Sequence, residues 1–107
     1  MTNPVRSLFA ALLTVACAAA FAQATNPNLA RDLAAGCANC HGTGGVSQDE
    51  IDSLAGKPKA ELVTKLQDFK NARRPGTVMP QLAKGYTDEQ IELIAGWFAA
   101  QKPPPAK

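Results

Sequence analysis

The sequence predicts an all-α fold with three main helices. Apolar residues recur at helical spacing in three segments, approximately 27–41, 58–72 and 87–102. Glycine and proline residues separate these segments, and none has the alternation of apolar and polar residues that is typical of a strand. We therefore expect helices joined by irregular loops.

The first helix is expected to start at Asn26 and Pro27, because asparagine is a frequent helix cap and proline fits the first turn. Leu29, Leu33 and Cys37 then follow at intervals of four residues. The glycines after residue 41 end this helix, and the polar segment 47–53 reads as a loop.

The second helix is expected to run from Pro58 to about Ala72. Leu62, Leu66 and Phe69 share one face of it, and this apolar face needs a partner.

The third helix begins at Thr87, whose hydroxyl can form a capping box with Gln90 three residues later. It ends before the proline run 103–105. Its expected buried stripe consists of Ile91, Ile94 and Phe98.

The N-terminal segment reads as an export signal. Arg6 supplies the positive region, and residues 8–20 are apolar but too short to span a bilayer. Cleavage after Ala22 would leave one domain, residues 23–107, in the periplasm, with no membrane span. An uncleaved membrane anchor and lipid attachment at Cys17 are the alternatives.

The expected mature chain is nearly neutral and poor in aromatic residues. Removal of Arg6 leaves ten Lys and Arg residues against nine Asp and Glu residues, a formal charge of about +1. This balance gives no support to nucleic-acid binding. So small a domain with four aromatic residues usually needs a metal, a disulfide or a large cofactor to hold its long loops together.

The motif Cys37-Ala38-Asn39-Cys40-His41 indicates covalent attachment of one haem. Two thiols three positions apart can each form a thioether with a haem vinyl group, and the adjacent histidine can reach the iron. A redox disulfide of the thioredoxin type is an alternative, but that motif belongs beside a strand. A zinc site is another, but the chain offers no second pair of Cys or His ligands.

Met79 is the candidate for the sixth iron position. Once the expected signal is removed, it is the only methionine, and His41 is the only histidine in the chain. Met79 and Pro80 are expected in a loop between the second and third helices. With both axial positions filled, the iron suits electron transfer rather than catalysis, whereas a labile sixth ligand would make the protein a haem enzyme or gas sensor.

Basic residues are frequent in the middle of the chain and could steer an acidic redox partner, pair with the haem propionates, or form a solvated face. Arg73 and Arg74 are the best placed for the haem, since they directly precede the segment with Met79. The others are Lys57, Lys59, Lys65, Lys70 and Lys84.

Three blocks of sequence resemble the class I c-type cytochromes over most of the expected mature chain. They are residues 54–56 (Leu-Ala-Gly), 66–70 (Leu-Gln-Asp-Phe-Lys) and 79–91, which runs from Met79 through Ala83-Lys84-Gly85-Tyr86-Thr87-Asp88-Glu89-Gln90-Ile91. Within this family the chain is similar to the small periplasmic cytochromes related to each half of the di-haem carriers. It is also similar to the haem subunit of flavocytochrome c sulfide dehydrogenase.

The resemblance implies a class I cytochrome c fold whose first helix crosses the last, with contact between residues 30–36 and Trp97 or Phe98. It places Cys37 and Cys40 at the thioether positions and His41 and Met79 at the axial positions. The implied function is electron transfer, as a free shuttle or as a subunit beside a flavoprotein. One position departs from the family, because relatives often have proline where this chain has Asp52, near the carbonyl that holds the haem histidine.

Overall fold

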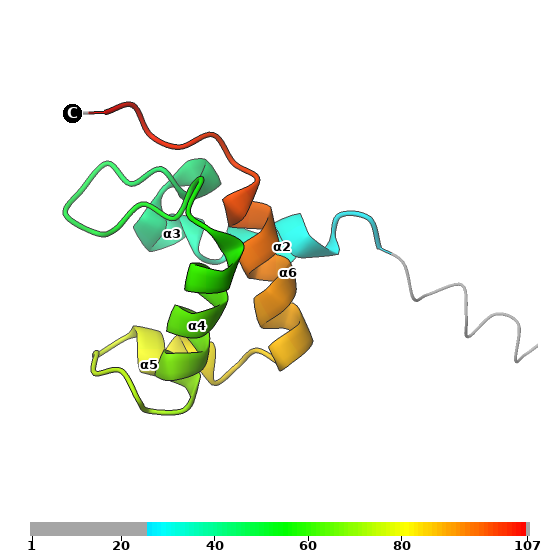
Figure 1. The fold of residues 1–107 in the computed structure, drawn as a ribbon, viewed down its shortest axis with the longest axis vertical. Helices are drawn as coiled ribbons and strands as arrows, with labels where there is room; N and C mark the ends of the chain where they lie inside the picture. Colours follow the sequence, from blue (N-terminus) through cyan, green and yellow to red (C-terminus); the bar gives the residue numbers. More distant parts are fainter. Residues whose placement is uncertain (1–25, 107) are drawn as a thin grey trace, which may run out of the picture.

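The computed structural model describes residues 26–106, and this part of the chain is helical without strands. The all-α prediction is therefore confirmed (Figure 1). The expected signal and its cleavage after Ala22 lie outside the described residues. The elements are α2 (Leu29–Ala35), α3 (Ala38–His41), the 3₁₀ turn η1 (Thr43–Gly45), α4 (Lys59–Lys70), α5 (Met79–Ala83) and α6 (Asp88–Ala99).

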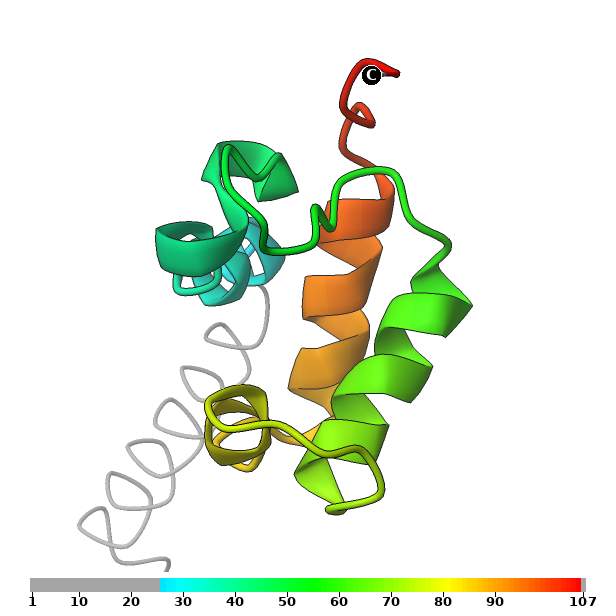
Figure 2. The same ribbon diagram turned by 90° about the vertical axis from the view of Figure 1, so that its left-hand side faces the viewer.

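The two longest helices, α4 and α6, lie side by side, and the shorter elements gather at their ends. Figures 1 and 2 both place α3 near one end of this pair and α5 near the other. Helix α2 packs against α6, and α4 contacts both α5 and α6. The short helix α3, which precedes the loop 42–58, and the short helix α5, which lies within the connection 71–87, are therefore brought to the same helix pair.

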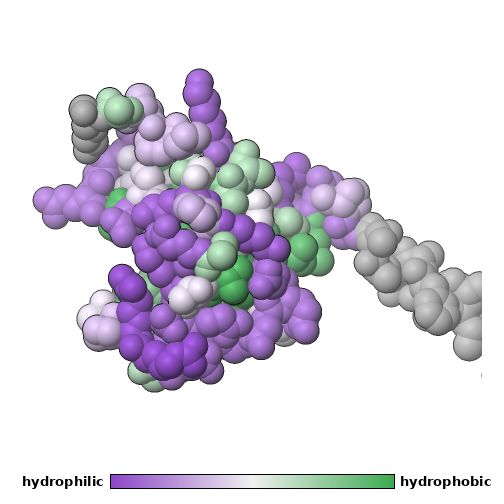
Figure 3. Space-filling model, viewed as in Figure 1, coloured by the Kyte–Doolittle hydropathy of each residue, from purple (hydrophilic) through white to green (hydrophobic). Residues whose placement is uncertain are grey.

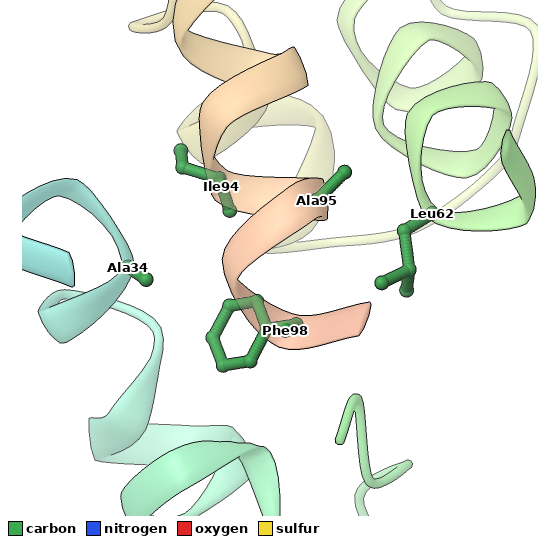
Figure 4. Packing of buried hydrophobic residues seen from close by; sticks show 5 residues of the cluster. All are labelled: Ala34, Leu62, Ile94, Ala95 and Phe98. Carbon is green, nitrogen blue, oxygen red and sulfur yellow. The ribbon is translucent and has the colours of Figure 1, made fainter. Parts of the chain in front are cut away.

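The core lies where α2, α6 and α4 meet. Figure 4 shows Ile94 and Phe98 projecting from α6 on the side of Ala34, while Ala95 projects toward Leu62 of α4. Trp97 packs at the edge of this cluster, with its ring 5.0 Å from the Phe98 ring in an edge-to-face arrangement. The predicted crossing of the first and last helices is confirmed.

Helix α6 begins as its sequence predicts. The Thr87 hydroxyl accepts a hydrogen bond from the backbone N–H of Gln90 at 3.1 Å, and the Gln90 side chain accepts one from the Thr87 N–H at 2.9 Å. The predicted stripe of Ile91, Ile94 and Phe98 is fully buried.

The first predicted helix is broken and starts later than expected. The Asn26 side chain accepts a hydrogen bond from the N–H of Asn28 and stabilises a turn before α2, which begins only at Leu29. At the other end the Cys37 N–H bonds to the carbonyl of Ala34, three residues back, so α2 stops before the cysteine motif. The motif then forms its own turn, α3.

The prediction of a loop around Met79 is wrong, because Met79 is the first residue of α5. Pro80 stands in the first turn of this helix, where its fixed φ angle and missing N–H are tolerated. The second helix is shorter than predicted: Pro58 caps it, and it ends at Lys70, just before Ala72 adopts a φ of 56°. Five α-helices therefore take the place of three among residues 26–106.

Two glycines shape the loop that follows α3. Gly42 has a φ of 82°, and a side chain there would lie 1.9 Å from the Val46 carbonyl oxygen. Gly45 has a φ of 79° and packs against the Phe98 ring, while its carbonyl accepts hydrogen bonds from the N–H groups of Leu54 and Ala55. These bonds close the base of the loop 46–53 and fix its position beside α3.

Hydrophilic residues cover most of the face shown in Figure 3, with small hydrophobic areas between them. Ion pairs connect several exposed residues of the domain, including Lys59 with Glu92 between α4 and α6 at 2.8 Å. No helix among residues 26–106 has the length and the apolar character needed to cross a membrane.

Candidate functional site: a cavity lined by the cysteine motif and Met79

A cavity of about 550 Å³ lies between the helices, within the size range of small-molecule and cofactor sites. It brings together all four residues that the sequence singles out, although they lie far apart along the chain. The cysteine motif contributes Cys37, Cys40 and His41, and Met79 comes from the first turn of α5. Since α3 and α5 lie near opposite ends of the α4 and α6 pair, the motif and Met79 reach this cavity from different ends (Figure 2).

The His41 ring is held by a backbone group of the loop 46–53. Its Nδ1 lies 2.6 Å from the backbone carbonyl oxygen of Asp52. Because a carbonyl can only accept, Nδ1 carries the hydrogen and donates it, which leaves the Nε2 lone pair available to a metal. The departure at Asp52 thus changes the side chain but keeps the carbonyl at the histidine.

The two cysteines of the motif both have free thiols. Cys37 is half-buried, and Cys40 is exposed. Burial, with a smaller contribution from the nearby Cys40, raises the pKa of the Cys37 thiol.

The rest of the cavity wall is mostly apolar. The predicted apolar face of the second helix lines it, and two residues of the α6 stripe join from the other side. An apolar wall excludes water and suits a large, flat, hydrophobic group. These residues are Leu62, Leu66, Phe69, Ile94 and Phe98.

Sequence reasoning missed several wall residues. Val78, Leu82 and Tyr86 line the cavity, but their sequence context carries no motif that assigns them to a site. Val78 and Leu82 are more than half exposed and add apolar surface to the cavity wall.

Three basic residues line the wall, namely Lys57, Lys65 and Arg74. Of the two arginines that the sequence favours, Arg74 reaches the cavity, whereas Arg73 pairs with Asp68 at 2.9 Å. The chain therefore offers positive charge to the cavity from α4 and from both of its flanking segments.

These features fit haem and not zinc. Two thiols and a histidine with a free Nε2 line the same apolar cavity as the Met79 thioether, which enters it from the other end, and this donor set suits a covalently attached haem. Within the part of the chain that the structure describes, no three His, Cys, Asp or Glu side chains are placed to hold a metal ion. The zinc alternative thus gains no support.

Comparison with known proteins identifies the class of the chain. No protein-family model matches it. The chain is 31% identical over 83 residues to cytochrome c-554(548) of Halomonas halodenitrificans, a match that covers 68% of this chain and all of that protein. It therefore belongs to the class I c-type cytochromes, and its cofactor is covalently bound haem c.

Two other relatives extend this result. The cytochrome subunit of sulfide dehydrogenase from Chlorobaculum tepidum is 52% identical over 66 residues, which is 62% of this chain and 60% of that protein. Cytochrome c4 of Pseudomonas aeruginosa is 34% identical over 70 residues, or 64% of this chain. The chain spans only 35% of the length of cytochrome c4.

Proposed function

We propose that this chain is a periplasmic electron carrier whose single haem c is held by Cys37, Cys40, His41 and Met79. The observation that carries the proposal is the convergence of these four side chains on one apolar cavity. The names of the relatives support it, since all are cytochromes or components of electron-transfer systems. We also propose that residues 1–22 are a cleaved signal peptide and that 23–107 form the haem domain.

The chain's own groups have distinct roles in this proposal. Each thiol of the motif adds across one vinyl group, so that sulfur bonds to carbon and the thiol hydrogen moves to the neighbouring carbon. His41 and Met79 are the axial ligands, and the Asp52 carbonyl keeps the His41 Nε2 free for the metal. When bound, haem supplies a one-electron couple, which a thioether opposite an imidazole shifts toward the reduced form. The apolar wall keeps water from the iron.

The test is the ligation of the purified protein. A denaturing gel stained for haem should show covalent cofactor, and the oxidised protein should show the charge-transfer absorption of methionine sulfur on haem iron. Met79→Ala should abolish this absorption, lower the reduction potential and admit external ligands, because the thioether is removed. Leu82→Ala is the matched control, since Leu82 lines the cavity from the same helix without a metal-binding atom.

An unchanged potential in Met79→Ala would overturn the assignment of the sixth ligand. Rapid binding of carbon monoxide or cyanide to the unmodified protein would instead favour a haem enzyme or gas sensor. Cys40→Ala should impair covalent attachment while Cys37 remains, and a gel without any haem in the unmodified protein would revive the dithiol alternative.

We further propose that the chain acts as the cytochrome subunit of a sulfide-oxidising flavoprotein. The relative at 52% identity, a cytochrome subunit of sulfide dehydrogenase, supports this partner. Purification from the source cell without high salt should yield a stable flavin-containing complex that transfers electrons from sulfide to the haem. A lone cytochrome that exchanges electrons with many partners would favour a free shuttle.

A further inference from the structure

The basic residues of the cavity wall differ in whether another side chain of the protein contacts their charged group. The Lys65 Nζ lies 2.7 Å from Glu61, and this hydrogen bond lowers the pKa of the Glu61 carboxyl. The guanidinium carbon of Arg74 lies 5.4 Å from the centre of the Phe69 ring, close enough for a cation–π contact. Both cations thus have an interaction within the protein.

Lys57 makes no such direct contact, although its charge, like that of Lys65, lowers the pKa of the Glu61 carboxyl. It is half-buried and lines the cavity, and it takes part in no salt bridge or side-chain hydrogen bond among residues 26–106. Its backbone is fixed, because its N–H donates to the Leu54 carbonyl and Pro58 caps α4 directly after it. Because Glu61 forms its salt bridge with Lys65 and not with Lys57, the Lys57 ammonium group can bind an anionic group of the cavity's occupant.

Haem has two propionate carboxylates, and the cavity wall has few carboxylates of its own that could bind Lys57 instead. Asp52 is the one carboxylate residue along the wall, and it is exposed. We propose that Lys57 binds one propionate of the haem as an ion pair. This inference rests on the proposed function, since it requires haem in this cavity.

The ion pair has a consequence for the redox chemistry. A cation beside a carboxylate favours its ionised form and so lowers the pKa of that propionic acid. Ionisation of the propionate stabilises the ferric iron, because the ferric state carries one more positive charge than the ferrous state. The reduction potential therefore falls as the pH rises through this pKa.

Other charged or titratable groups face the same cavity, and their effects on the reduction potential must be distinguished from the effect of Lys57. On α4 and its flank they are Lys65, which is paired with Glu61 outside the wall, and Arg74, and the remaining wall adds Asp52 and Tyr86. A titration of the potential alone could reflect any of them. Substitution of single side chains in the haem-loaded protein distinguishes them.

The experiment compares Lys57→Gln with Lys59→Gln in the haem-loaded protein. Lys59 is the matched control, because it lies two residues away but pairs with Glu92 and does not line the cavity. The reduction potential and the proton NMR shifts of the haem substituents are measured across the pH range. Lys57→Gln should raise the propionate pKa by about one unit or more, and Lys59→Gln should leave it unchanged.

A second variant shows whether a change in the propionate pKa comes from the lost charge or from a folding defect at position 57. Lys57→Arg keeps the positive charge and should keep the propionate pKa near that of the unmodified protein. The proposal is overturned if Lys57→Gln leaves the pKa unchanged, if Lys57→Arg raises it equally, or if Lys65→Gln or Arg74→Gln alone produces the shift. Absence of covalent haem from the unmodified protein would overturn the proposed function instead.

Discussion

At the scale of single residues, the contact that orients His41 comes from the backbone of Asp52 and not from its carboxylate. The carbonyl oxygen of Asp52 lies 2.6 Å from Nδ1, while the side chain is exposed. The proline that relatives often have at this position has the same carbonyl. Side-chain identity can therefore change here without loss of the hydrogen bond that sets the tautomer of His41.

This distinction predicts that Asp52→Ala leaves the ligation of the haem unchanged. The substitution removes the carboxylate and keeps the carbonyl, so the charge-transfer absorption and the rate of binding of external ligands should match the unmodified protein. A small rise in the reduction potential is expected from the lost negative charge. Loss of the methionine absorption in Asp52→Ala would show that the side chain, and not the backbone, holds the site.

At the scale of elements, the capping box at the start of α6 stabilises the helix that supplies half of the buried hydrophobic residues among residues 26–106. Thr87→Ala removes the acceptor for the Gln90 N–H and should lower the free energy of unfolding by about 1 kcal/mol. Thr64→Ala is the matched control. The Thr64 hydroxyl donates to the Ala60 carbonyl inside α4, so its loss should cost little in denaturant unfolding. Equal losses in both variants would contradict the role of the cap.

A second contact ties α4 to the start of α6. Lys70 and Gln67 donate hydrogen bonds to the Asp88 carboxylate at 2.7 and 3.0 Å, and these bonds, with that of Lys70 the larger cause, lower the pKa of Asp88. A carboxyl group whose pKa is lower in the folded state stabilises the protein above its unfolded pKa. That stability is lost as the pH falls through the lower, folded value.

Asp88→Asn should therefore lower the melting temperature at neutral pH, and the difference should shrink as the pH falls below the usual aspartate value of 3.8 and disappear below the lower pKa of the folded state. Because Asp88 is solvent-exposed, the effect is expected to be small and to decrease in high salt. Glu89→Gln is the control, since Glu89 stands in the same first turn. A difference that persists in acid would rule out this account.

The sequence predicted the helix faces and the capping box better than the boundaries of the helices. The stripe Ile91, Ile94 and Phe98 and the box at Thr87 are signals of side-chain spacing and of local hydrogen bonding, and both are confirmed. The break before Cys37 and the helix at Met79 depend on how the chain packs around the cavity. Local propensity does not contain that information.

At the scale of the whole molecule, the site was predictable where one motif or one unique residue marks it. Cys37, Cys40, His41 and Met79 all line the cavity. The wall contributed by Val78, Leu82 and Tyr86 was not predictable, because it arises only when α5 and the following turn fold against α4. The different environments of Lys57 and Arg73 were not predictable either, because both are basic residues in the middle of the chain and no local signal distinguishes them.

The core of the domain is small relative to the cavity that it surrounds. Eight hydrophobic residues are buried among residues 26–106, and half of them are alanines. A cavity of about 550 Å³ leaves the apolar side chains along its wall without the close contacts of a packed core. A small domain has only about 5–15 kcal/mol of stability in total, so the loss of these contacts matters.

We therefore predict that the chain without haem is largely unfolded. Circular dichroism of protein made without haem attachment should show little of the helix content of the loaded form, and addition of free haem should restore part of it. The double variant Cys37→Ala and Cys40→Ala is the matched preparation, because it lacks the thioethers but keeps both axial ligands. A cooperative unfolding transition in the haem-free chain would show that the helices α2, α4 and α6 form a sufficient core without the cofactor.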